Sequence, residues 1–344
     1  MRKGKNIVAV IAFVVAIFLA FGLEGQSVLA HSLVINEDPI FVSPDTGDGD
    51  VDNSDSGYID VDYSPGSIYD GVSVLEANAS LGVSTQLGAA ATDSSYDLRD
   101  YNRVTPVRNQ FSGGTCWSFA AICSSESSAI TEGLKPYSAD LSELQLAYFM
   151  YHTVSDPMGN YGSDGVYFGP GQDYDYFTLG GNDLYATMTL AKWVGVTNEL
   201  PNMAYPSNYN IYPSADYASE YAFSYDSMHL ENALWVDIGD KEAVQSNLIN
   251  YGAATVSIYY DNAYLNTDSG KKGAYYYNGT SYGNNHAVSI VGWDDNYSKT
   301  NFLTQPPGNG AWLIKNSYGT SHGDNGYLWV SYYDRGITGS NSTP

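Results

Sequence analysis

Cys116 is the residue of this sequence best placed for covalent chemistry. It follows the glycine-rich run Ser112-Gly113-Gly114-Thr115 and begins a predicted helix. Unpaired backbone amides and the helix dipole at such a position favour the thiolate, which is the reactive form of cysteine. These features indicate a nucleophile, which needs a base, a group that orients the base and an oxyanion site.

Three other side chains could complete such a site. Gln110 lies six residues before the cysteine, so its amide and the cysteine backbone N–H could together hold an oxyanion. His286 opens a predicted strand over residues 287–291, and Asn316 closes one over residues 311–315. If these strands pair antiparallel, the two side chains meet at one end of the sheet. The arrangement predicts a Cys–His–Asn triad, with an ion pair between thiolate and imidazolium.

Two further residues of reactive type are expected to take no part. Cys123 lies seven residues beyond Cys116, which on one helix separates their Cα atoms by about 10 Å, too far for a disulfide. It is expected to be a small buried hydrophobic residue. His322 could compete as the base, but it lies in a Gly-x-Ser-x-Gly turn without an obvious orienting partner.

Helices are predicted first and strands afterwards. The helices are expected over residues 115–131, from Leu141, over 183–193 and over 241–251, with Ser142 and Gln145 forming a capping box. The strands are expected over 254–259, 287–291, 311–315 and 327–332, separated by Gly, Asn and Pro turns as in antiparallel sheets. Residues 150–179, rich in Tyr, Gly and Asp, are expected to form a surface insertion. This order is typical of an α+β chain with two lobes.

The first thirty residues have the pattern of a secretory signal peptide. Three basic residues precede an apolar run over residues 7–21, about 22 Å long as a helix and too short for a hydrocarbon core of about 30 Å. Val28-Leu29-Ala30 offers small residues for cleavage after Ala30. An uncleaved membrane anchor is the alternative, and otherwise the chain is expected to be exported and to meet a membrane only through this segment.

The next segment is acidic and poor in residues that could form a core. Twelve acidic residues and no Lys or Arg occur between His31 and Ser95. Residues 31–91 are therefore interpreted as a prosegment or spacer that is poorly ordered alone.

Charge and composition narrow the possible partners. The chain has 344 residues, 38 acidic against 14 basic, and a net charge of −24, which argues against binding nucleic acid or an anionic membrane surface. No histidine pair or cysteine pair has metal-site spacing, so neither a metal nor another cofactor is expected.

Several stretches resemble, in the same order, those of the papain-like cysteine peptidases. They are residues 96–99, 106–119, 141–145, 180–181, 285–293, 315–319 and 325–327. The resemblance implies a papain-like two-lobe fold over residues 92–335, with a helical lobe at about 112–205, an antiparallel, β-barrel-like lobe at about 206–335 and a C-terminal tail at 336–344.

The resemblance also implies residue roles. Cys116 is expected to be the nucleophile, His286 the base, Asn316 the orienting residue and Gln110 the oxyanion donor. The remaining expected site residues would face the substrate, two glycines through their backbone and the others through side chains at the subsites or beside the triad: Gly180, Gly181, Asn285 and Tyr318.

Three departures separate the chain from the family pattern. Gly113 stands where the family has a second cysteine, and Tyr318 stands where it has a tryptophan. The distance along the sequence from Cys116 to His286 is also longer than usual, which implies insertions. These features resemble the bacterial surface branch, in which a lectin-like domain follows the catalytic one; any sugar or calcium site of such a domain is expected to lie outside this sequence.

The sequence thus predicts a secreted cysteine endopeptidase that acts on extracellular or cell-surface proteins. It is expected to be made as a precursor whose prosegment ends near Ala91, so its partners would be protein or peptide substrates and its own prosegment. Two alternatives stay open: a hydrolase of cell-wall peptides (a peptidoglycan amidase), and a non-catalytic surface adhesin on a protease scaffold.

Overall fold

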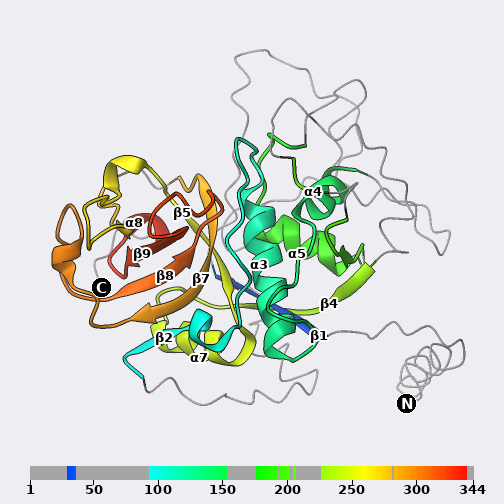
Figure 1. Ribbon diagram of the computed structural model, residues 1–344, viewed down its shortest axis with the longest axis horizontal. Coiled ribbons are helices and arrows are strands. Elements are labelled where there is room, and N and C mark those ends of the chain that lie inside the picture. The colour runs from blue at the N-terminus through cyan, green and yellow to red at the C-terminus, as the bar shows by residue number, and fades with distance from the viewer. Residues whose placement is uncertain are drawn as a thin grey trace, which may run out of the picture.

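The computed structural model describes residues 29–35, 93–152, 176–192, 194–200, 204–206, 226–280 and 283–338. The predictions for the signal peptide up to residue 28, for most of the acidic segment and for residues 153–175 of the insertion fall outside these described residues, as does Trp193. Figure 1 shows a group of helices beside a group of strands, which is the two-lobed α+β arrangement expected from the sequence.

Three helices build the first lobe: α3 (Cys116–Thr131), α4 (Glu143–Tyr151) and α5 (Asp183–Ala191). The second helix begins where predicted, because the Ser142 hydroxyl accepts a hydrogen bond from the Gln145 backbone N–H at 3.1 Å. The Gln145 side chain instead donates to the Val194 carbonyl at 3.0 Å, so only half of the predicted capping box forms.

The core of this lobe is made by the inner faces of the three helices. Its largest members are almost fully buried: Trp117, Ile122, Leu144, Phe149 and Leu190. Tyr176 and Phe177, at the end of the predicted surface insertion, are also buried in this core. The insertion therefore returns to the core before α5 begins.

Four strands form the antiparallel centre of the second lobe: β5 (Ala254–Ile258), β7 (His286–Asp294), β8 (Ala311–Lys315) and β9 (Tyr327–Ser331). Ile290 of β7 lies opposite Ile314 of β8, and Ser289 opposite Lys315, so the predicted pairing is present. Residues His286 to Trp293 are all buried, because α3 packs on one face of β7. This burial explains why β7 is a continuous apolar run.

Further elements complete the described part of the chain: β1 (Leu29–Ile35), β2 (Ser95–Asp97), η1 (Leu98–Tyr101), β3 (Val196–Thr197), β4 (Asp226–Trp235), α7 (Lys241–Tyr251), η2 (Asn262–Tyr264), β6 (Ala274–Tyr275), η3 (Lys299–Asn301) and α8 (Arg335–Thr338). The described strands follow the order β3-β4-β1-β5-β7-β8-β9-β6, with β2 also on β7. The pairings of β1 with β4 and β5, and of β6 with β9, are parallel, whereas the sequence predicted antiparallel strands alone.

Two sequence boundaries need correction. β1 crosses the predicted cleavage point after Ala30, and its residues 31–35 pair with the sheet although they were assigned to the prosegment. The predicted C-terminal tail, from residue 336, begins inside α8: Ile337 is fully buried, and the buried carboxylate of Asp334 accepts hydrogen bonds from the backbone N–H groups of Gly336 and Ile337. Among the described helices, none combines the length and the apolar character that a membrane crossing requires.

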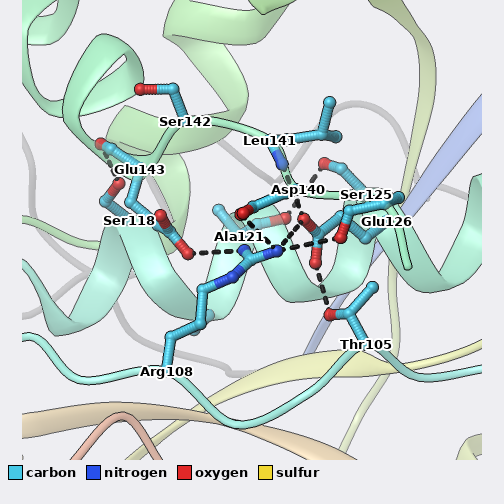
Figure 2. A network of polar contacts seen from close by, with 12 residues as sticks. Thr105, Arg108, Ser118, Ala121, Ser125, Glu126, Asp140, Leu141, Ser142 and Glu143 are labelled. Atoms are coloured by element: carbon cyan, nitrogen blue, oxygen red, sulfur yellow. Dashed lines mark hydrogen bonds and ion pairs between the residues drawn. The ribbon is translucent and has the colours of Figure 1, made fainter. Parts of the chain in front are cut away.

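A buried guanidinium joins several of these segments (Figure 2). Arg108 forms ion pairs with Glu126 of α3 at 2.8 Å, with Asp140 at 2.7 Å and with Glu143 of α4 at 2.8 Å. Glu126 also accepts hydrogen bonds from the Leu141 backbone N–H at 2.8 Å and from a threonine hydroxyl. Burial raises the pKa of Glu143 to about 7, against the opposing effect of the guanidinium.

We expect the Arg108→Met variant to lose about 3–5 kcal/mol of unfolding free energy, because it leaves buried carboxylates without their cation. Urea denaturation followed by circular dichroism measures this value. The matched control is Lys241→Met, which breaks a half-exposed pair with Asp295 at 3.1 Å and should cost at most about 1 kcal/mol. Equal losses in both variants would contradict the role of the buried network.

Candidate active site

Cys116 is the first residue of α3, at the end of a turn held by aromatic side chains. The Gly114 backbone N–H donates to the Phe177 carbonyl at 2.7 Å, and the Tyr205 hydroxyl lies 2.5 Å from the Thr115 hydroxyl. A Cβ on Gly113 would lie 2.4 Å from the Tyr205 hydroxyl and 2.6 Å from the Phe177 ring. The position therefore has no room for a cysteine, and stacked aromatic rings occupy the space in which a bridge would start.

His286 and Asn316 meet where β7 begins and β8 ends. The His286 Nε2 atom lies 2.8 Å from the Asn316 side-chain oxygen, and both side chains are buried. Because an amide oxygen only accepts, Nε2 carries the ring proton and Nδ1 keeps its lone pair. The antiparallel pairing of the two strands brings these side chains together, as the sequence argument required.

The sulfur of Cys116 lies next to this pair. It receives a backbone hydrogen bond from Ala287, the residue that follows His286. The Tyr318 ring stacks on the imidazole with centroids 4.6 Å apart, and its hydroxyl lies 3.3 Å from His286 Nδ1. Burial, and the charge of Cys116 second, raise the pKa of Tyr318 to about 12, so the phenol keeps its proton.

The buried environment opposes a separate charge on either reactive group. Burial raises the pKa of the Cys116 thiol, although backbone hydrogen bonds at the start of α3 and from Ala287 act in the opposite direction. Burial also lowers the pKa of His286 to about 4. The sequence argument considered the helix dipole and predicted a thiolate; the structure adds a larger desolvation cost that favours the neutral thiol beside a neutral imidazole.

Gln110 is fixed by contacts to both lobes. Its side-chain oxygen accepts from the Ser317 hydroxyl at 2.5 Å, and its Nε2 donates to the Gly113 carbonyl at 2.7 Å. Its backbone N–H donates to the Ser317 carbonyl at 2.7 Å. An amide nitrogen carries two protons, so these contacts orient the group and commit one of the two.

The two glycines expected to face substrate lie just before α5. Gly180 has φ of +78°, and its carbonyl accepts from the Tyr151 hydroxyl at 2.5 Å. A Cβ on Gly181 would lie 2.4 Å from the indole of Trp117, the residue after the cysteine. The segment therefore runs close to the start of α3, which requires glycine at the second position.

The structure gives Asn285 a role that the sequence did not suggest. Its side-chain oxygen accepts from the Tyr260 backbone N–H at 2.7 Å, and its nitrogen donates to the Tyr260 carbonyl at 3.0 Å. Both ends of the amide thus hold the chain that leaves β5, so contact between this amide and a substrate stays a prediction.

Sequence reasoning missed the partners of His322. This ring lies 2.8 Å from the Tyr260 hydroxyl through Nε2, and its Nδ1 lies 3.3 Å from the Asn316 side-chain nitrogen. The tyrosine is 62 residues away, and no local pattern signals such a contact. Within the described residues, no group of three or more His, Cys, Asp or Glu side chains could hold a metal ion.

We expect His286 to titrate near pH 4 in the Cys116→Ala variant, because burial without a neighbouring thiolate penalises the imidazolium. The variant isolates the ring from the sulfur, and ¹H–¹⁵N NMR of the ring nitrogens measures the pKa. The same resonance in urea should return to about 6.5. A folded-state pKa at or above that value would contradict the desolvation argument.

Comparison with known proteins places this geometry in context. Residues 92–344 match the sequence model described as papain family cysteine protease. Fruit bromelain of Ananas comosus is 27% identical over 260 residues, covering 73% of this chain and 57% of that protein. Macrodontain-1 of Ananas macrodontes is 28% identical over 245 residues, covering 70% of this chain and 89% of that protein.

Among solved structures, the chain is similar to the cysteine protease and lectin-like domains of Cwp84, a surface layer associated protein of Clostridium difficile. The identity is 28% and the TM-score 0.56, with 73% of this chain and 50% of that chain covered. The present chain therefore spans about half the length of that structure and less than two thirds of fruit bromelain.

Proposed function

The chain belongs to the papain family of cysteine proteases, and from this premise we propose that it is an exported cysteine endopeptidase. The observation that carries the proposal is the buried pair of His286 and Asn316, 2.8 Å apart, with the sulfur of Cys116 bonded to the backbone of the next residue. A nucleophile, a base and an orienting acceptor are then in one place, which acyl transfer requires.

In the first step, His286 acts as a general base toward the thiol. As the sulfur of Cys116 attacks the scissile carbonyl carbon, its proton passes to Nδ1 and the carbonyl π electrons move to oxygen. The Asn316 oxygen accepts from Nε2–H and stabilises the imidazolium. The net charge of the pair stays zero during this transfer, so the desolvation that opposes a single charge is largely avoided.

The oxyanion is held by two N–H groups. One is the backbone N–H of Cys116, and the other is the second Nε2 proton of Gln110, whose amide is oriented by Ser317. When the intermediate collapses, the C–N bond breaks and the leaving amine takes the proton from His286. Water then gives a proton to the imidazole, attacks the thioester and releases the carboxylic acid with the thiol restored.

The substrate class follows from export and from the backbone edge beside the nucleophile. Gly180 and Gly181 lie close to Trp117 and lead into α5, so their peptide groups suit pairing with an extended substrate. The predicted signal peptide and the similarity to a surface layer associated protease support extracellular or cell-surface proteins as substrates. Residues 31–91 would be the prosegment removed on maturation.

We expect an epoxide thiol inhibitor to label Cys116 and not Cys123, which is buried in a separate small core cluster. Peptide mapping by mass spectrometry locates the label. In parallel, Cys116→Ala should lower kcat/KM on a peptide library by more than about 10³-fold. The matched Cys123→Ala variant should stay within about tenfold of the parent, since that residue only packs.

Three results would point elsewhere. Label on Cys123 would remove the assignment of the nucleophile. Release of muropeptides from cell walls without cleavage of any library peptide would favour a cell-wall hydrolase. No measurable change in any activity on Cys116→Ala would favour a non-catalytic adhesin.

A further inference from the structure

His322 lies on the turn between β8 and β9, behind the residue that orients the base. Its backbone N–H donates to the Gly319 carbonyl at 3.3 Å, and its carbonyl accepts from the Gly326 N–H at 2.8 Å. Gly319 and Gly323 have φ of +75° and +58°, values that suit glycine and let the chain turn back within a few residues. The turn therefore holds the half-buried imidazole in a defined place.

The ring contacts a different partner through each nitrogen. On one side, Nε2 lies 2.8 Å from the Tyr260 hydroxyl and 3.4 Å from the Asn262 side-chain oxygen. On the other side, Nδ1 lies 3.3 Å from the Asn316 side-chain nitrogen. The imidazole thus links the end of β5 to the amide that faces His286.

These contacts permit one consistent direction of hydrogen bonding. The Tyr260 hydroxyl donates its only proton to the Asn262 oxygen at 3.0 Å, so toward His322 it accepts. His322 must then carry its proton on Nε2, which leaves the Nδ1 lone pair to accept from the Asn316 nitrogen. That amide in turn presents its oxygen to Nε2–H of His286, and the catalytic Nδ1 is left with its lone pair.

We propose that His322 is a positioning residue for peptide hydrolysis: its neutral ring holds the Asn316 amide in the orientation that serves His286, and protonation of its Nδ1 releases that amide. A protonated Nδ1 would oppose one N–H donor to another, so the Asn316 nitrogen would lose its acceptor. The inference deepens the proposed function and rests on it for its effect on rate.

The groups that face His322 set the direction of this response. They are His286 at the start of β7, Tyr260 after β5, Tyr318 in the same turn and Lys272 in the turn before β6. Burial and then the charge of Lys272 lower the pKa of His322 below its usual value. The ring is therefore neutral at pH 7, and it takes up a proton only as the solution becomes acidic.

The position of the ring also argues against a role as the base itself. Its accepting nitrogen faces the Asn316 amide, and its other nitrogen faces Tyr260. Neither is directed at the sulfur of Cys116, which lies beside the backbone that follows His286. His322 therefore acts through Asn316.

Two substitutions separate the hydrogen bond from the ring. His322→Phe keeps an aromatic ring but removes the acceptor, so kcat at pH 7 should fall by about tenfold, the effect of one neutral hydrogen bond, with KM little changed. His322→Gln can present an acceptor and cannot titrate. It should recover most of the kcat lost in His322→Phe, and its acid limb in kcat should lie at lower pH than that of the parent.

An equal kcat and an equal acid limb in the parent and both variants would overturn the proposal. A loss in both variants with an unshifted acid limb would also overturn it, since that pattern reflects packing alone. Thermal unfolding of each variant by circular dichroism checks that the compared proteins are folded.

A readout that needs no turnover keeps this inference distinct from the proposed function. In the Cys116→Ala background, the ¹H–¹⁵N signal of the Asn316 side-chain amide should shift with the protonation of His322, and the shift should vanish on His322→Gln. An amide that does not respond to pH would refute the positioning contact even if peptides are cleaved. A responding amide in a protein that cleaves no peptide would support the contact and remove the proposed function.

Discussion

The ion pairs around Arg108 are the constraint on which the geometry of the candidate site depends. One guanidinium neutralises carboxylates from α3, from α4 and from the loop between them, and each carboxylate would be costly to bury alone. The same residue lies two positions before Gln110, and its carbonyl accepts from the Gly319 N–H at 3.0 Å. The network thus fixes the helix that carries the cysteine, the oxyanion donor and the turn after Asn316 relative to one another.

The turn before Cys116 shows how shape can replace a covalent bridge. Tyr205 stacks on Phe177 with centroids 5.2 Å apart and meets Phe119 edge-on at 4.8 Å, and its hydroxyl donates to the Gln110 carbonyl at 3.0 Å. Together these contacts restrain both ends of the loop that a disulfide at Gly113 would restrain. They also make the loop depend on packing within the helical lobe, so its order is coupled to the folding of that lobe.

Local patterns predicted what is decided locally. The helix from Lys241 to Tyr251 and the Ser142 cap follow from periodicity and capping, and the meeting of His286 with Asn316 follows from antiparallel pairing of two apolar runs. The contact between His322 and Tyr260 joins residues too far apart in sequence for such patterns. The pKa directions at the site also escaped prediction, because they depend on how deeply a side chain is buried in the final packing.

The buried chain from Tyr260 to His286 is built from neutral groups, and this choice has a physical reason. A carboxylate in place of Asn316 would stabilise an imidazolium more strongly, but it would place a charge among residues that have little contact with water. An amide has both an acceptor and a donor, so it can orient one imidazole only if something fixes which end faces it. A second imidazole on the donor side performs that task at no cost in charge as long as it stays neutral. A site organised by neutral hydrogen bonds therefore gains its direction from the last fixed donor, the phenol of Tyr260, and loses it when a proton enters the chain from outside.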